Sequence, residues 1–209
     1  MKFFQASSLK FFVLLLLLSG CSQGIKTEQD FYKWLNDEHH GLSKVRKAGG
    51  IAVSLKYLPA EFIAWKEAQG KGLSKAQSDS LNKLNQGSLT FLLTIAPENK
   101  ERGGDVMYYG VSNEQEYKQK SYELNFRMGE FITIKSQNKD YHPLFVTLEN
   151  TYSVTNSRTF YVVFSQKEIP SEDSVQVVFN DEFFGTGINH FNFKRSDFNN
   201  VPALGTISP

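Results

Sequence analysis

A carboxylate and a histidine two positions apart are the first residues in this chain whose spacing could support chemistry. Asp140 and His142 would share one face of a strand, because side chains alternate along a strand. A carboxylate beside an imidazole is a possible general acid–base pair. The same residues also fit a turn aspartate and a strand-edge histidine before Pro143, since aspartate is common in turns for backbone reasons. We favour this second interpretation and keep the pair as a weak binding candidate.

Three further candidates lie near the end of the chain. Asp181 and Glu182 could bind a partner or a divalent cation, but their segment does not match the calcium loop D-x-[DN]-x-[DN]-G. His190 follows Gly185 and Gly187, the first two glycines of a dinucleotide-binding fingerprint that lacks its third. These glycines also precede a predicted strand, whereas the fingerprint must open a helix. The pattern therefore favours a glycine turn.

The run Asp37-Glu38-His39-His40 contains residue types that bind metals. Adjacent histidines on a helix point about 100° apart and do not converge on one ion. Asp37 and His40 can meet one turn apart, but a catalytic zinc needs three protein ligands. The run therefore predicts a solvated helix end, and no metal site is expected.

Other catalytic motifs lack the residues that would support them. The chain has no G-x-S-x-G and no P-loop. The S-x-x-K matches at Ser80/Lys83 and Ser136/Lys139 lack the accompanying S-D-N and K-T-G. We predict no catalytic residue and no cofactor.

Helix signals occur mostly in the first half of the chain. Each start carries a capping side chain, a capping box or a proline suited to the first helical position. The predicted helices run from Thr27 to Gly41, from Pro59 to about Gln69, from Ser74 to about Leu84 and from Ser112 to about Met128.

Strand signals dominate the second half. The predicted strands there are Phe131–Lys135, His142–Leu148, Arg158–Ser165, Ser174–Asn180 and Ile188–Lys194. Earlier strands are expected on both sides of Gly49-Gly50, at Leu89–Ile95 and at Asp105–Val111. Even spacing of short strands indicates an antiparallel arrangement. The fold class is therefore α+β, with an antiparallel β-sheet or sandwich in the C-terminal half and three to four short helices in the N-terminal half.

Alternation within the predicted strands indicates which residues face the core. Phe160, Val162 and Phe164 should point inward, and Phe191 and Phe193 should do so in the last strand. Val163 would then lie on the outer face, where an apolar residue hints at partial cover.

Composition excludes several classes of function. The chain has 23 Lys and Arg against 22 Asp and Glu, whereas a nucleic-acid binder would concentrate a basic excess. The single cysteine, Cys21, excludes an intramolecular disulfide.

The first residues resemble the signal peptide of a bacterial lipoprotein. A basic start at Lys2 and Lys10 precedes an apolar run that is too short to span a bilayer, and Leu18-Ser19-Gly20-Cys21 closes it. The last four residues are similar to the lipobox, whose cysteine receives diacylglycerol before cleavage on its amino side. The resemblance implies a signal peptide over residues 1–20 and a lipidated tether over residues 21–27. Strand signals on both sides of the helices, with no strong linker between them, predict one domain over residues 28–209. The body resembles only small lipoproteins of Gram-negative bacteria, which implies no activity.

Residues after the cysteine bear on localisation. Ser22 stands where an aspartate would retain a lipoprotein in the inner membrane, and residues 22–26 carry no acid of the kind used for surface export. The resemblance implies an outer-membrane anchor facing the periplasm.

Two functions are consistent with this sequence. The first is a non-enzymatic, membrane-anchored protein that binds another envelope component, either a protein or a glycan. The alternative is a hydrolase of envelope polymers that uses Asp181, Glu182 or the Asp140/His142 pair, and a subunit of an export or assembly machine is a third possibility. A concave pocket with converging carboxylates, or a carboxylate meeting a histidine, would favour the enzyme. Exposed aromatics on a flat or convex surface would favour the binder.

Overall fold

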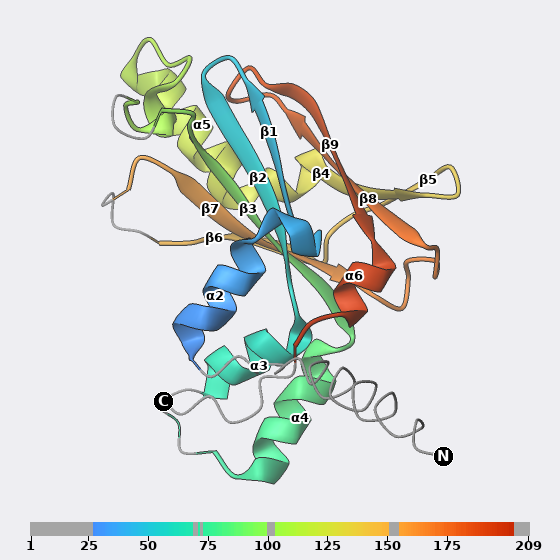
Figure 1. Ribbon diagram of the computed structural model, residues 1–209. Helices are drawn as coiled ribbons and strands as arrows, with labels where there is room; N and C mark the ends of the chain where they lie inside the picture. Colours follow the sequence, from blue (N-terminus) through green and yellow to red (C-terminus); the bar gives the residue numbers. More distant parts are fainter. Residues whose placement is uncertain (1–26, 69–70, 72, 100–102, 151–154, 203–209) are drawn as a thin grey trace, which may run out of the picture.

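The computed structural model describes residues 27–68, 71, 73–99, 103–150 and 155–202, and it shows an α+β fold with two antiparallel sheets (Figure 1). Sheet A has the order β1-β2-β3-β7-β6, and sheet B has the order β5-β4-β8-β9. The strands of sheet A are β1 (Ser43–Ala48), β2 (Ile51–Leu58), β3 (Ser88–Pro97), β7 (Arg158–Ser165) and β6 (Phe145–Leu148). Those of sheet B are β5 (Lys139–Tyr141), β4 (Ile132–Ser136), β8 (Ser174–Asp181) and β9 (Gly187–Lys194).

Five α-helices and three short 3₁₀ turns are found in the described residues. The helices are α2 (Glu28–Asn36), α3 (Ala60–Ala68), α4 (Lys75–Asn85), α5 (Glu114–Phe126) and α6 (Arg195–Asn199). The 3₁₀ turns are η2 (Glu38–His40), η3 (Val106–Tyr108) and η4 (Met128–Phe131). Helices α2, α3 and α4 gather in the lower part of Figure 1.

Capping explains where the first helices begin and end. The Thr27 hydroxyl accepts a hydrogen bond from the Asp30 amide, and Ser74 and Gln77 form the predicted capping box. Helix α2 ends before Gly41, since Asp37 breaks it and starts η2. The predicted fold class is confirmed, and sheet A also takes β1, β2 and β3 from the N-terminal half.

Two sequence predictions around residue 110 are wrong. Asp105–Val111 is not a strand, because the Asp105 carboxylate accepts from the Met107 amide and turns the chain into η3. The helix predicted to start at Ser112 is capped one residue later, since the Asn113 side chain accepts from the Glu116 amide.

The predicted strand over His142–Leu148 is confirmed only for β6 (Phe145–Leu148), while β5 (Lys139–Tyr141) ends before it and was not predicted. Strand β5 pairs with β4 in sheet B, and β6 pairs with β7 in sheet A. Pro143 lies between them, and a proline cannot donate to a ladder. Leu144, which lies just before β6, is 59% exposed.

The main core lies between the facing sides of the two sheets. Phe91 of sheet A packs against Phe193 of sheet B, with ring centroids 5.4 Å apart. Phe160, Val162 and Phe164 are fully buried, as the alternation predicts. One continuous cluster of buried side chains therefore joins the two sheets.

The outer face of sheet A is partly covered by helices. Lys56 on β2 donates to the Asn36 side chain of α2, and Val163 and Thr159 are each only 9% exposed. Val163 is therefore an apolar residue on a face that helices partly cover, as the alternation pattern predicts.

We expect Phe164→Ala to lower the free energy of unfolding by about 3–5 kcal/mol, since it leaves a cavity where a fully buried ring packs. Phe126→Ala is the matched control, because Phe126 is 75% exposed and its loss should cost about 0.5 kcal/mol or less. Denaturant melts of the two variants test this. Equal losses would contradict the assignment of the core.

Candidate functional site

The predicted pair Asp140 and His142 does not form an acid–base site. Asp140 lies on β5 opposite Lys135, and its carboxylate is 3.8 Å from the Lys135 ammonium. His142 follows the strand and is exposed, and no hydrogen bond or ion pair joins it to Asp140 in the described chain. Both residues are solvated at the edge of sheet B.

Asp181 is a structural carboxylate that holds the turn between β8 and β9. It is 7% exposed, and its oxygens accept from the amides of Phe183, Phe184 and Thr186 at 2.8, 2.9 and 2.7 Å. The Thr186 hydroxyl donates a fourth bond at 2.6 Å. A carboxylate with both oxygens bonded in this way has no capacity left for a substrate.

The other candidates near this turn are exposed. The Glu182 carboxylate accepts from the Asn180 side-chain amide at 3.4 Å, and the His190 side chain is exposed to solvent. Gly185 and Gly187 have φ angles of +73° and +70°, so the expected glycine turn is present.

A carboxylate does meet a histidine at η2, but on an exposed turn. The Asp37 carboxylate is 2.7 Å from His39 Nδ1 and 3.9 Å from His40 Nε2, and the His39 side chain is 94% exposed. The His39 pKa is raised by its hydrogen bond to Asp37. The Asp37 carboxylate also accepts from the His39 amide, so the contact caps the turn. No group of three metal ligands occurs among the described residues.

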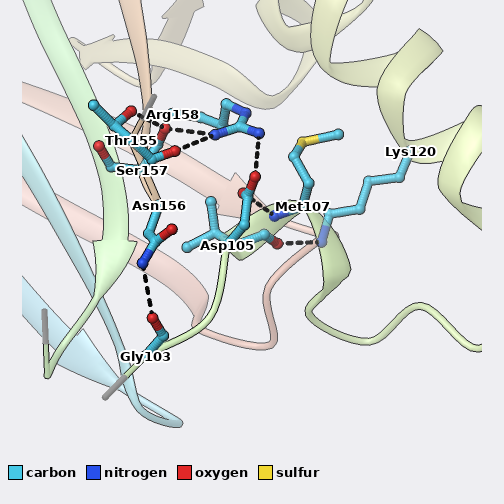
Figure 2. Close-up of polar contacts among 9 residues, drawn as sticks. Gly103, Asp105, Met107, Lys120, Thr155, Asn156, Ser157 and Arg158 are labelled. Carbon is cyan, nitrogen blue, oxygen red and sulfur yellow. Dashed lines mark hydrogen bonds and ion pairs between the residues drawn. The ribbon is translucent and has the colours of Figure 1, made fainter. Parts of the chain in front are cut away.

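A buried polar network lies at one end of β7 (Figure 2). Arg158 forms an ion pair with Asp105 at 2.6 Å and donates to the carbonyls of Thr155 and Ser157. Asp105 also accepts from the Met107 amide, so it joins η3 to β7.

Lys120 of α5 completes this network from the other side. Its ammonium donates to the carbonyls of Val106 and Tyr109 at 3.1 and 2.7 Å and lies 4.2 Å from the centre of the Phe184 ring. Burial lowers the Lys120 pKa to about 8, although the charges of Asp181 and Asp105 oppose this shift. A lowered lysine pKa can mark a nucleophile. Here the ammonium points into the protein and its donors are engaged, so Lys120 ties α5 to η3.

The strongest candidate site is a pocket on the outer face of sheet A, which we call the outer pocket. Its volume is about 590 Å³. The strands supply its floor, and α2, α3 and α4 supply its wall. It is lined by Tyr32, Leu58, Phe62, Ile63, Lys66, Glu67, Leu84, Asn85, Ser88, Thr90, Phe145, Thr147, Tyr161 and Val163.

The strand register explains why the floor is apolar. Leu58, Thr90, Val163 and Phe145 are consecutive partners across β2, β3, β7 and β6, so their side chains form one row on the same face. In the next row, Tyr161 lies opposite Thr147. These residues are distant in sequence, and no motif marks them.

Large apolar side chains remain exposed around the outer pocket. Tyr161 is 38% exposed, Phe145 is 55% exposed and Leu84 is 74% exposed. Burial raises the Tyr161 pKa, so its hydroxyl is neutral at physiological pH. Tyr161 can therefore donate one hydrogen bond beside an apolar ligand surface.

Charged groups at the outer pocket do not form a catalytic arrangement. The Lys66 ammonium lies 5.7 Å from the centre of the Tyr32 ring, and the Glu67 carboxylate accepts from the Asn85 amide at 3.3 Å. Glu67 is the one carboxylate in the described lining, which contains no histidine. The arrangement can bind an apolar group, but it offers no acid–base pair.

Comparison of the chain with protein-family models, with curated proteins and with solved structures finds no match. Within the described residues, no helix has both the length and the apolar character needed to cross a membrane.

We expect Lys120→Met to lower the free energy of unfolding by about 1–3 kcal/mol at pH 7, because it leaves two buried carbonyls unpaired. Between about pH 8 and pH 10.5 the folded state of the unmodified chain releases the Lys120 proton while the unfolded state keeps it. Its stability relative to Lys120→Met should therefore rise over this range.

The measurement is a series of denaturant melts from pH 7 to pH 10.5. Lys118→Met is the matched control on the same helix, because its side chain is 69% exposed and forms only a surface pair with Glu114. A stability difference that stays constant with pH would mean that the Lys120 pKa is not lowered.

Proposed function

We propose that this protein is a membrane-anchored envelope lipoprotein that binds another envelope protein through the outer pocket and catalyses no reaction. The anchor is supported by the lipobox resemblance at Leu18-Ser19-Gly20-Cys21, which lies outside the described residues. The binding role is supported above all by the outer pocket, because a concave apolar surface ringed by exposed aromatics is typical of a binding site.

The chemistry of the lining favours a protein partner over a glycan. Phe62, Val163 and Phe145 present hydrocarbon, and Tyr161 adds one aromatic surface with a single hydroxyl. A sugar ring carries a hydroxyl on most of its carbons and needs many directed hydrogen bonds. An apolar side chain of a protein needs few, so it matches this lining better.

The alternative, a hydrolase of envelope polymers, has less support. The Asp181 oxygens accept hydrogen bonds within the β8–β9 turn, and Asp140 does not contact His142. The contact of Asp37 with His39 is the one observation on the enzyme side, and it lies on an exposed turn outside the outer pocket.

We expect Cys21→Ser to release the protein from the membrane or to block its processing, because serine lacks the sulfur that carries the lipid in the lipobox resemblance. Metabolic labelling with a radioactive fatty acid, followed by membrane fractionation, measures both effects. Label retained by the Cys21→Ser chain would show that the anchor is attached elsewhere.

We expect the double variant Phe145→Ala/Tyr161→Ala to reduce recovery of its partner at least about tenfold, which corresponds to about 1.4 kcal/mol of lost binding. The measurement is quantitative mass spectrometry of proteins cross-linked to the lipidated chain in intact envelope. The double variant Tyr122→Ala/Phe126→Ala is the matched control, since these residues are 53% and 75% exposed on α5, away from the outer pocket.

Equal recovery of the partner by both double variants would contradict a role of the outer pocket. Release of soluble fragments from envelope polymers by the purified chain would favour the hydrolase.

A further inference from the structure

Three of the four sheet edges carry features that prevent pairing with another strand. Edge strand β1 carries Lys44, Arg46 and Lys47, and charged residues block edge-to-edge association. Strand β9 lies against β1, where the Arg46 side chain donates to the His190 carbonyl. Strand β5 has three residues, two of them charged.

Strand β6 is the edge without this protection. Its sequence from Phe145 to Leu148 contains no charge, and it forms the outer edge of sheet A. Leu144 and Phe145 are 59% and 55% exposed at its start. An apolar, unprotected edge is a template for pairing with another strand.

The hydrogen-bond register shows which backbone groups face outward. The Glu149 amide donates to the Thr159 carbonyl at 2.7 Å, so Glu149 and Thr159 form a hydrogen-bonded pair. Alternation along the antiparallel ladder then turns the backbone of Thr147 towards β7 and that of Val146 and Leu148 away from it. In the described part of the chain, no strand accepts these outward groups.

We propose that β6 pairs with an extended segment of a partner polypeptide, which adds a strand to sheet A and places alternate apolar side chains at the outer pocket. This inference rests on the proposed function and names the form in which the partner binds. Four outward backbone groups at two-residue spacing fit an extended peptide, because only a strand presents donors and acceptors at that repeat.

The outer pocket gives the added strand a preferred sequence pattern. A strand beside β6 would lie about 4.8 Å from it. Its residues on the outer face would extend the row that ends in Val163 and Phe145. Apolar residues at every second position would then meet Phe145 and the open side of the outer pocket, while the backbone pairs with Val146 and Leu148.

A second copy of the chain fits this edge less well. An antiparallel pairing of two β6 strands centred on Thr147 would place Phe145 of one copy opposite Glu149 of the other. That arrangement sets a carboxylate against the apolar end of the edge, so a partner with its own apolar pattern is favoured.

Proline substitutions separate backbone pairing from side-chain contact. Val146→Pro removes an outward amide and should be tolerated, because edge strands accept proline on the solvent side. Val146→Ala is the matched control, since it loses similar packing and keeps the amide. Thr147→Pro removes an amide that faces β7, so it should lower the melting temperature more than Val146→Pro does. This comparison checks which amides of β6 point towards β7 and which point outward.

The probe is a fluorescent synthetic peptide of alternating valine and threonine, flanked by lysines and tested against the lipidated full chain in detergent. We expect saturable binding that weakens at least about fivefold in Val146→Pro, which corresponds to one lost hydrogen bond, and less than about twofold in Val146→Ala. The same peptide N-methylated at every residue should not bind. If Val146→Pro fails to fold, Leu148→Pro and Leu148→Ala make the same comparison.

Several results would overturn the proposal. One is that the plain peptide fails to bind at millimolar concentration. Others are that the N-methylated peptide binds as tightly as the plain peptide, or that the proline and alanine variants bind the plain peptide equally well. A dimer that Val146→Pro converts to a monomer would identify the occupant as a second copy. If Val146→Pro keeps the envelope partner that Phe145→Ala/Tyr161→Ala loses, strand pairing fails while the proposed function stands.

Discussion

Packing of phenylalanine rings between the two sheets is the interaction on which the rest of the structure depends. Phe91 contacts Phe164 of its own sheet, Phe193 of the opposite sheet and Phe198 of α6. With one cysteine in the chain, no intramolecular disulfide can replace these contacts. Buried rings contribute large apolar areas, so a few of them can fix the distance between the sheets. The position of every loop then follows from where its strands leave this core.

Buried charged side chains stabilise the turns and short helices at the ends of the strands. Asp181 closes the β8–β9 turn, and Asp105 joins η3 to Arg158. Lys120 binds the carbonyl of Val106, the first residue of η3, and that of Tyr109, the residue after it. Each of these groups is satisfied by backbone or by an opposite charge, which offsets the cost of burying it. Their chemistry is therefore used for structure. The apolar outer face of sheet A is the surface to which we assign the proposed binding role.

Local sequence rules predicted the elements whose signals act within a few residues. The capping box at Ser74 and the alternation of Phe160, Val162 and Phe164 gave the correct helix start and the correct inward face. The rules failed where a distant contact or a single break decided the outcome. Asp105 turns its segment into η3 next to Arg158, and the strand predicted from His142 begins only at Phe145, after Pro143. The outer pocket was not predictable, because its lining comes from residues that only the strand register and helix packing bring together.

The outer pocket and the unprotected edge at β6 have one physical cause. Sheet A is five strands wide, but α2 and α3 reach its outer face from the side of β2 and β3. The cover therefore ends over β7, where Val163 is still buried and Tyr161 is half-exposed. Beyond that point, none of the described helices covers the outer face of β6 and none of the described strands pairs with its outer edge. A partner strand would satisfy both features at once, since its side chains would extend the helical cover and its backbone would complete the ladder. The same strand meets both needs, so strand addition explains more of this surface than a ligand held in the outer pocket alone.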